Sequence, residues 1–183
     1  ACWEKELPQT AGQTKGEMLP YLVSKIGRFI ENQMVRNIIG QERSGFNFRE
    51  VMDKKKILLV NLSKGKVGEM NATLLGLIVV TKLQMAALAR ADMPEADRND
   101  FYLYIDEFQN FVTDSIATIL AEARKYRLDL IMAHQYIGQL VQNNDTRVRD
   151  AIFGNVGTIV SFRIGVDDSE TIAKQLAPVV SEF

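Results

Sequence analysis

Two adjacent carboxylates, Asp106 and Glu107, are the residues of this chain best placed to do chemistry. They directly follow Phe101–Ile105, an unbroken apolar and aromatic run that is typical of a strand buried on both faces of a parallel sheet. Because an unpaired carboxylate is costly inside a sheet, we expect the pair at the strand's carboxyl end, where open α/β sheets bind ligands. There an Asp can hold Mg²⁺, and a Glu can orient and polarise an attacking water. An edge strand running into an acidic turn would give the same pattern.

An apolar strand that ends in Asp-Glu is the Walker B pattern of ATP-driven proteins. Its usual companion is a phosphate-binding loop, Gly-x-x-x-x-Gly-Lys followed by Ser or Thr, and the chain contains no such loop. The nearest stretch, Ser63–Gly68, has Gly65 and Lys66, but Val67 replaces the hydroxyl residue and the glycine spacing is wrong. We interpret this stretch as a flexible basic turn. If the site takes ATP, its phosphate cradle is expected upstream of Ala1.

Other polar side chains lie on elements next to the carboxylate pair. Gln135 follows the next predicted strand, Leu128–Ala133, where RecA-like motors place a sensor of the γ-phosphate; it could equally satisfy loop backbone groups. Arg124 is a candidate arginine finger for a neighbouring subunit's ATP, although the helix dipole alone favours cations at that helix end. Arg163 is a weaker candidate for the same rim. His134, the single histidine, has no metal-ligand neighbours and is interpreted as structural.

Composition and charge are those of an ordinary globular chain. The 183 residues are 46% hydrophobic and 25% charged, and the formal net charge of −1 gives no global basic field for nucleic acid, although a local patch could bind it. A single cysteine, Cys2, cannot form an internal disulfide or a zinc site, which favours an intracellular compartment. No apolar run reaches the length of a membrane span, so we expect no membrane contact from this segment itself. The start at Ala1 indicates a piece of a longer protein.

Apolar periodicity predicts helices that alternate with short strands. Helices are expected over Met18–Ile39, Asn71–Ala91, Ser115–Tyr126 and Ser169–Leu176, with a short one over 147–153. Strands are expected over Ile57–Leu62, Phe101–Ile105, Leu128–Ala133 and Thr158–Phe162. Gln41–Lys56 is interpreted as a connector anchored by Phe46 and Phe48. This alternation favours a mainly parallel sheet covered by helices on both faces.

Five stretches in order resemble the FtsK–HerA superfamily of DNA-pumping ATPases, most closely the type IV secretion coupling proteins of the TraG/TraD kind. They are Lys56–Gly65 (KILLVNLSKG), Phe101–Phe111 (FYLYIDEFQNF), Ala121–Leu128 (AEARKYRL), Ala133–Leu140 (AHQYIGQL) and Phe153–Arg163 (FGNVGTIVSFR). The resemblance implies an α/β chain with a partial RecA-like P-loop NTPase fold. Residues 1–50 would be the end of an inserted all-helical subdomain and a connector, and 51–183 would be the carboxyl-terminal half of the ATPase core. The missing Walker A motif departs from the complete family pattern, so this chain alone is expected to be inactive.

The resemblance also implies roles for single residues. Asp106 and Glu107 would be the Walker B pair, with Asp106 binding Mg-ATP by holding Mg²⁺ directly or through water. Glu107 would activate the attacking water. Gln135 would be the sensor and Arg124 the finger that completes a neighbour's site. ATP and Mg²⁺ are thus the expected cofactors.

The implied partners are DNA, further copies of the chain in a ring that is typically a hexamer, and secretion or relaxosome proteins. Lys64 and Lys66 are candidate pore-facing contacts to DNA phosphates, although a solvated loop would look the same. The protein would work on the cytoplasmic side, with the full-length protein anchored in the membrane by segments outside this chain.

The sequence therefore predicts part of an ATP-driven DNA translocase that serves conjugation or type IV secretion. Within this class, a soluble HerA-like helicase or translocase is the alternative, and a small upstream β-barrel rather than two transmembrane segments would mark it. From other classes, a catalytically inactive RecA-like scaffold or interaction module stays open. So does an α/β module whose Asp-Glu pair binds a metal or a peptide.

Overall fold

A computed structural model of the protein describes Pro20, Val23, Gly27 and the residues 31–111, 115–141 and 144–176, with the backbone alone for 115–118. The chain divides into two compact units, Ala1–Gly45 and Phe46–Phe183. The expected loop over Ala1–Gly16 lies outside the described residues, as does most of the first part of the expected helix Met18–Ile39.

Helix α2 (Gln33–Ile39) is the longest described helix of the first unit. It begins after Asn32, whose side-chain oxygen accepts hydrogen bonds from the backbone N–H groups of Met34 and Val35, and it ends at Gly40. An asparagine in extended conformation at this place is a strong helix start signal. The single helix expected over Met18–Ile39 is therefore interrupted at Asn32, whereas the predicted stop at Gly40 is confirmed.

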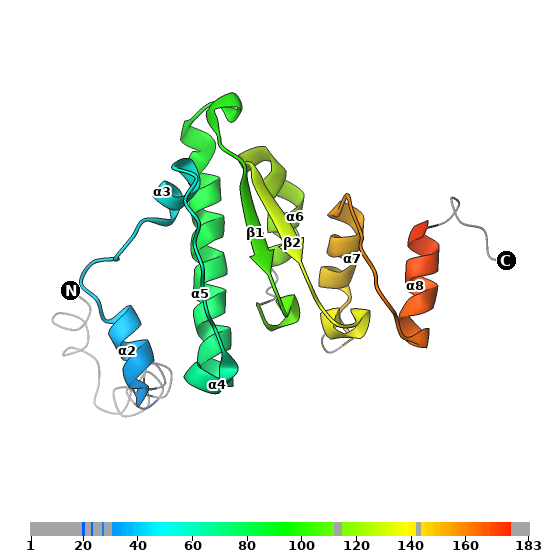
Figure 1. Ribbon diagram of the computed structural model, residues 1–183, viewed down its shortest axis with the longest axis horizontal. Helices are drawn as coiled ribbons and strands as arrows, with labels where there is room; N and C mark the ends of the chain where they lie inside the picture. The colour runs from blue at the N-terminus through cyan, green and yellow to red at the C-terminus, as the bar shows by residue number, and fades with distance from the viewer. Residues whose placement is uncertain are drawn as a thin grey trace, which may run out of the picture. The chain divides into compact units, whose positions relative to one another are not determined.

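Two parallel strands, β1 (Phe101–Ile105) and β2 (Leu128–Met132), form the sheet of the second unit (Figure 1). The ladder continues past both strand ends, because the N–H of Ala133 donates to the carbonyl of Ile105 and the N–H of Phe108 donates to the carbonyl of Ala133. The two central predicted strands are thus confirmed. Their parallel pairing places both carboxyl ends at one edge of the sheet.

One face of this sheet is covered, and the other is exposed within the described part of the chain. Tyr102 and Tyr104 on β1 are 57% and 73% exposed, whereas Ile105 on the alternate face is buried. The prediction that β1 is buried on both faces is therefore wrong. The two tyrosines can face water because each ring carries a polar hydroxyl group. The covered face joins a core built from Met52, Leu83, Ala86, Ala87, Ile105, Phe108, Ile119, Ala123, Leu128, Leu140 and Ile152.

The second unit also contains the helices α3 (Phe48–Asp53), α4 (Lys64–Val67), α5 (Glu69–Leu88), α6 (Ser115–Glu122), α7 (Arg147–Asn155) and α8 (Val166–Leu176) (Figure 1). Of these, α3, α5, α6 and α7 supply residues to the core, whereas α4 and α8 have no buried residue. Short 3₁₀ helices lie between them: η3 (Ala89–Asp92), η4 (Glu95–Asp97), η5 (Phe108–Phe111), η6 (Ala123–Tyr126) and η7 (Ile137–Leu140). The predicted helices over Asn71–Ala91 and Ser115–Tyr126 correspond to α5 with η3 and to α6 with η6. The last helix begins at Val166, before the predicted Ser169.

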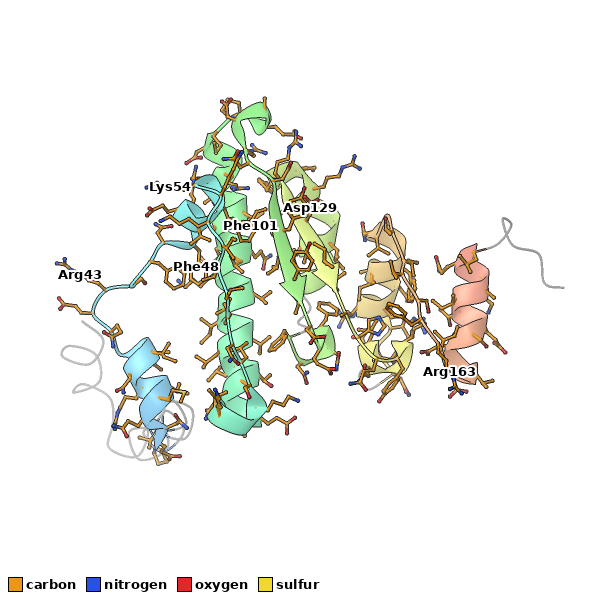
Figure 2. The ribbon with its side chains drawn as sticks, in the orientation of Figure 1. Arg43, Phe48, Lys54, Phe101, Asp129 and Arg163 are labelled. Carbon is orange, nitrogen blue, oxygen red and sulfur yellow. The ribbon has the colours of Figure 1, made fainter. Side chains whose placement is uncertain are left out.

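Helix α3 lies in the stretch that was interpreted as a connector. Its start is marked by Asn47, whose side-chain oxygen accepts hydrogen bonds from the backbone N–H groups of Arg49 and Glu50. Phe48, labelled in Figure 2, packs against the core. Phe46 contacts the Phe48 ring with 4.8 Å between ring centroids. Phe48 therefore anchors this stretch in the core as predicted, whereas Phe46 is 48% exposed, and the stretch contains a helix that begins at Phe48.

The strands expected over Ile57–Leu62 and Thr158–Phe162 do not form. Both segments are without regular secondary structure, and several of their apolar side chains face solvent: Ile57 is 88%, Leu59 90% and Phe162 90% exposed. A strand exists only when a neighbouring strand accepts and donates its backbone hydrogen bonds. In the described residues β1 and β2 pair with each other alone. The arrangement is α/β, and a RecA-like fold stays a prediction.

Helix α5 contradicts the expectation that no apolar run reaches the length of a membrane span. Together with η3 it forms a helical stretch, Glu69–Asp92, that by length and composition is apolar enough to cross a membrane, with a mean hydropathy of 1.8. Core helices of globular proteins share these properties, and this one supplies Leu83, Ala86 and Ala87 to the core. Halfway along α5, Gly76 is buried where the Phe111 ring and the Leu62 side chain come close to its backbone.

Arg90 is the one completely buried charged side chain among the described residues, and its hydrogen bonds link three segments of the chain. Its Nε donates to the Asp53 carboxylate of α3 at 2.9 Å. One terminal nitrogen donates to the carbonyls of Asn99 and Tyr126 at 2.9 and 3.0 Å. This guanidinium fixes the start of β1 and the approach to β2 against α3, which positions the strands that carry the site.

Candidate functional site

The turn after β1 carries the carboxylate pair in a strained, well-defined conformation. Glu107 has φ of +50°, in the left-handed region that a side chain with a Cβ rarely adopts. The N–H of Glu107 donates to Asp106 Oδ1 at 3.0 Å, and its carbonyl accepts from both the backbone and the side chain of Asn110 at 3.0 Å. Phe108, fully buried, anchors the turn in the core. These contacts hold Asp106 and Glu107 just past the carboxyl end of β1.

The Glu107 carboxylate accepts hydrogen bonds from two side-chain amides. Gln135 Nε2, just past the end of β2, donates to Oε1 at 2.8 Å. Gln109 Nε2, from the turn η5, donates to Oε2 at 2.6 Å. Because β1 and β2 are parallel neighbours, residues that follow their ends meet at one edge of the sheet. The structure thus brings Asp106, Glu107 and Gln135 together, as the sequence predicted.

In the loop that carries Gln135, side-chain oxygens accept hydrogen bonds from the backbone N–H groups of three successive residues. Gln139 Oε1 accepts from the N–H of Gln135 at 3.0 Å and of Tyr136 at 3.3 Å. Asp168, on helix α8, accepts from the N–H of Ile137 at 3.1 Å. A near neighbour, Gln139, and a distant residue, Asp168, therefore fix the backbone of the loop that carries Gln135.

Lys64 contributes the nearest positive charge to this edge. Its Nζ lies 2.9 Å from Glu69 Oε1 and 3.4 Å from Asn110 Oδ1. Hydrogen bonds from Gln135 and Gln109, together with the Lys64 charge, hold the pKa of the Glu107 carboxyl below its ordinary value. Glu107 is therefore held in its ionised form at neutral pH and can accept a hydrogen bond from water.

The basic stretch around Lys64 is a helical turn rather than the flexible turn that was expected. Residues Lys64–Val67 form α4, and Gly68, with φ of +81°, leads directly into α5. A positive φ of this kind is what glycine adopts without strain. Lys66 is exposed on α4, whereas Lys64 is engaged with Glu69.

Among the described residues, no hydrogen bond or ion pair joins Arg124, Arg163 or His134 to the carboxylate pair, although His134 directly precedes Gln135. Arg124 is exposed on η6, just before β2 begins, whereas Glu107 lies past the opposite end of the strands. The two ends of the sheet are separated by the length of a five-residue strand, about 16 Å. The prediction placed Arg124 in a neighbour's site, which a single chain does not test. Arg163 is exposed on the connection between α7 and α8 (Figure 2). His134 Nδ1 lies 3.2 Å from the carbonyl of Tyr136, within its own loop.

Sequence reasoning missed two amides of the turn, Gln109 and Asn110. Gln109 contacts the Glu107 carboxylate, and Asn110 links the Glu107 backbone to Lys64. Their signal was present in the sequence, since two amides that follow two carboxylates after a single residue, Phe108, are natural hydrogen-bond donors to them. No cluster of three or more His, Cys, Asp or Glu side chains suited to a metal occurs within the described ranges. Mg²⁺ in phosphate sites uses one or two carboxylates besides phosphate and water oxygens, and exposed Asp106 fits such a role.

Comparison with known families adds an independent observation. Residues 100–182 match a family model described as the TraM recognition site of TraD and TraG. The match contains β1, the carboxylate turn, β2, Gln135, α7 and α8. No curated protein and no solved structure gives a significant match. Residues 100–182 are thus similar to the carboxyl-terminal region of conjugation coupling proteins of the TraG/TraD kind.

Proposed function

We propose that this chain carries the water-activating part of the ATPase motor of a conjugation coupling protein that moves DNA. The observation that supports this most is the contact between Glu107 and Gln135 at the carboxyl ends of two adjacent parallel strands. A carboxylate held by a polar amide at this place can orient the water that attacks a nucleotide γ-phosphate. The family match to TraD and TraG supports the conjugation setting.

Each side chain of the site has a part in this proposal. Asp106, exposed beside Glu107, holds Mg²⁺ directly or through a water. Glu107, ionised at neutral pH, accepts the hydrogen bond of the attacking water and orients it. Gln135 keeps the carboxylate in place and can report on the γ-phosphate. When bound, Mg-ATP supplies the phosphoryl group and the metal charge that stabilises the leaving oxygen.

The remaining parts lie outside a single copy of this chain. Because no phosphate-binding loop occurs in the sequence, we propose that an upstream segment of the natural protein provides it. Arg124, exposed at the opposite end of the strands, would enter the site of the next subunit in a ring. The exposed apolar segments at 57–62 and 158–162 would then be covered by further strands of the complete fold.

The test is ATP turnover by the natural full-length polypeptide, with and without DNA. Glu107→Gln should lower kcat about 100-fold or more, because it removes the proton acceptor but leaves the shape of the side chain. ATP binding should persist in that variant. Glu170→Gln, which changes an exposed glutamate of α8, is the matched control and should turn over ATP as the parent does. Turnover near the parental rate in Glu107→Gln would refute the role of Glu107. A parent with no turnover would favour the inactive scaffold.

A second candidate function is partner recognition by residues 100–182. The description of the matching family names TraM as the protein recognised by TraD and TraG. We propose that this segment binds the TraM-type protein of its own transfer system. Isothermal titration of the 183-residue chain with that protein should show saturable binding. A TraM-type protein from an unrelated transfer system is the specificity control, and absence of binding to the cognate protein would reject this function.

A further inference from the structure

We propose that Gln109 is a positioning residue for the hydrolytic reaction, acting through Glu107. This inference rests on the function proposed above, since it assigns Glu107 the contact with water. Gln109 and Gln135 would together fix the plane of the Glu107 carboxylate, so that one of its remaining lone pairs always points to the place where water must stand.

The geometry is that of a clamp with one donor on each carboxylate oxygen. Gln135 Nε2 lies 2.8 Å from Oε1, and Gln109 Nε2 lies 2.6 Å from Oε2. The two donors come from different elements, the loop after β2 and the turn η5. The last torsion of a glutamate side chain has a broad energy profile, so a carboxylate with one donor can rotate. With a donor on each oxygen, rotation breaks at least one charge-assisted hydrogen bond.

Gln109 is itself held in one orientation. Its Oε1 is buried and has no hydrogen-bond partner among the described residues, while its amide nitrogen faces the carboxylate. Turning the amide around would place Oε1 against the negative charge of Glu107, which is worse than leaving it without a partner. Buried Phe108 precedes Gln109, and Phe111, packed close to Gly76 of α5, ends the same turn. The donor is thus preorganised before any ligand binds.

The neighbouring amide does not duplicate this contact. Asn110 donates to the backbone carbonyl of Glu107 and lies near Lys64, so it supports the turn and leaves the carboxylate alone. The charged groups near the carboxylate are Asp106 beside it and Lys64, which is itself paired with Glu69. Neither charge fixes the carboxylate plane, because neither donates a hydrogen bond to Glu107 in the structure.

The experiment compares Gln109→Met with Gln109→Asn in the natural full-length polypeptide. Methionine keeps the length of the side chain but has no donor, and asparagine keeps the amide but withdraws it by about 1.5 Å. Both variants should lower kcat about 10- to 100-fold, because the catalytic group is misplaced, and should leave the KM for ATP within about twofold. Gln175→Met, on the exposed face of α8, is the matched control and should keep the parental kcat.

A second readout follows the carboxylate itself in the 183-residue chain without nucleotide. With ¹³C-labelled glutamate, the Glu107 Cδ signal, assigned by its loss in Glu107→Gln, should move and broaden in both Gln109 variants and stay in place in Gln175→Met. An unmoved Glu107 signal in a folded Gln109→Met chain would overturn the proposal, as would parental kcat. A lower kcat with an unmoved signal and a lower melting temperature would show a merely structural role, and would also overturn it. If Glu107→Gln still hydrolyses ATP, the proposed function fails, while the signal still decides whether the clamp exists.

Discussion

Replacing Gly76 by alanine should destabilise the protein, although alanine is the better helix former. In an open helix this change would gain about 1 kcal/mol. At this place in α5, however, the new Cβ would lie far inside the 3.0 Å that real Cβ contacts respect from the Phe111 ring, and 3.0 Å from Leu62 Cδ1. The ring must therefore shift, and overpacking of this kind costs about 1–3 kcal/mol. We expect a net loss of about 1 kcal/mol in the free energy of unfolding.

Urea unfolding of the 183-residue chain, followed by circular dichroism, measures this change. Gly154→Ala in α7 is the matched control, because no atom lies within 4 Å of a Cβ built there. That control should stabilise the chain by up to about 1 kcal/mol. Adding Phe111→Leu should make Gly76→Ala less harmful, with a coupling energy of about 1 kcal/mol in the double-mutant cycle. If Gly76→Ala stabilises as much as Gly154→Ala does, the close packing of Phe111 on α5 is refuted.

Three further predictions concern stability and local structure. Arg90→Met should cost about 3 kcal/mol in urea unfolding, because it leaves Asp53 Oδ1 and two carbonyls without their donor, while Arg49 still donates to Asp53 Oδ2. A loss below about 1 kcal/mol would contradict a stabilising role of these buried hydrogen bonds. Hydrogen bonds from two lysines lower the pKa of Glu50 from 4.5 to about 2, so its stabilising effect is complete above pH 4.5 and disappears as the pH falls through 2. Glu50→Gln should therefore be less stable than the parent at pH 6 and equal to it near pH 2, and an equal deficit at both values would contradict this. Asp168→Ala should speed hydrogen exchange of the Ile137 amide by removing its acceptor, and an unchanged exchange rate would exclude that contact.

The expectation of strands at Ile57–Leu62 and Thr158–Phe162 shows where local pattern misleads. Apolar, β-branched residues indicate which segments suit a sheet, but a strand forms only beside a partner backbone. In contrast, the stretch from β1 through α6 to β2 is a complete strand–helix–strand unit, and its pairing was predictable because such units close on themselves. Helix α3 was missed because its apolar stripe is short, although Asn47 marks its start.

The carboxylate pair and Gln135 were predictable because each lies within three residues of a strand end, and parallel neighbouring strands bring their carboxyl ends together whatever lies between them. The hydrogen bond from Gln109 to the Glu107 carboxylate was not predictable, because it depends on the left-handed turn at Glu107 and on the amide orientation that follows from this turn.

The sequence by itself determined the parallel strand pair, the edge where chemistry can occur and the likeness to conjugation coupling proteins, because these depend on local runs and residue order. Only the tertiary structure decided which oxygen of Glu107 each amide holds, that Phe111 packs over Gly76, and that Asp168 of α8 fixes the loop of Gln135. Those contacts join residues far apart in the chain, and their geometry depends on how whole elements pack rather than on any local pattern.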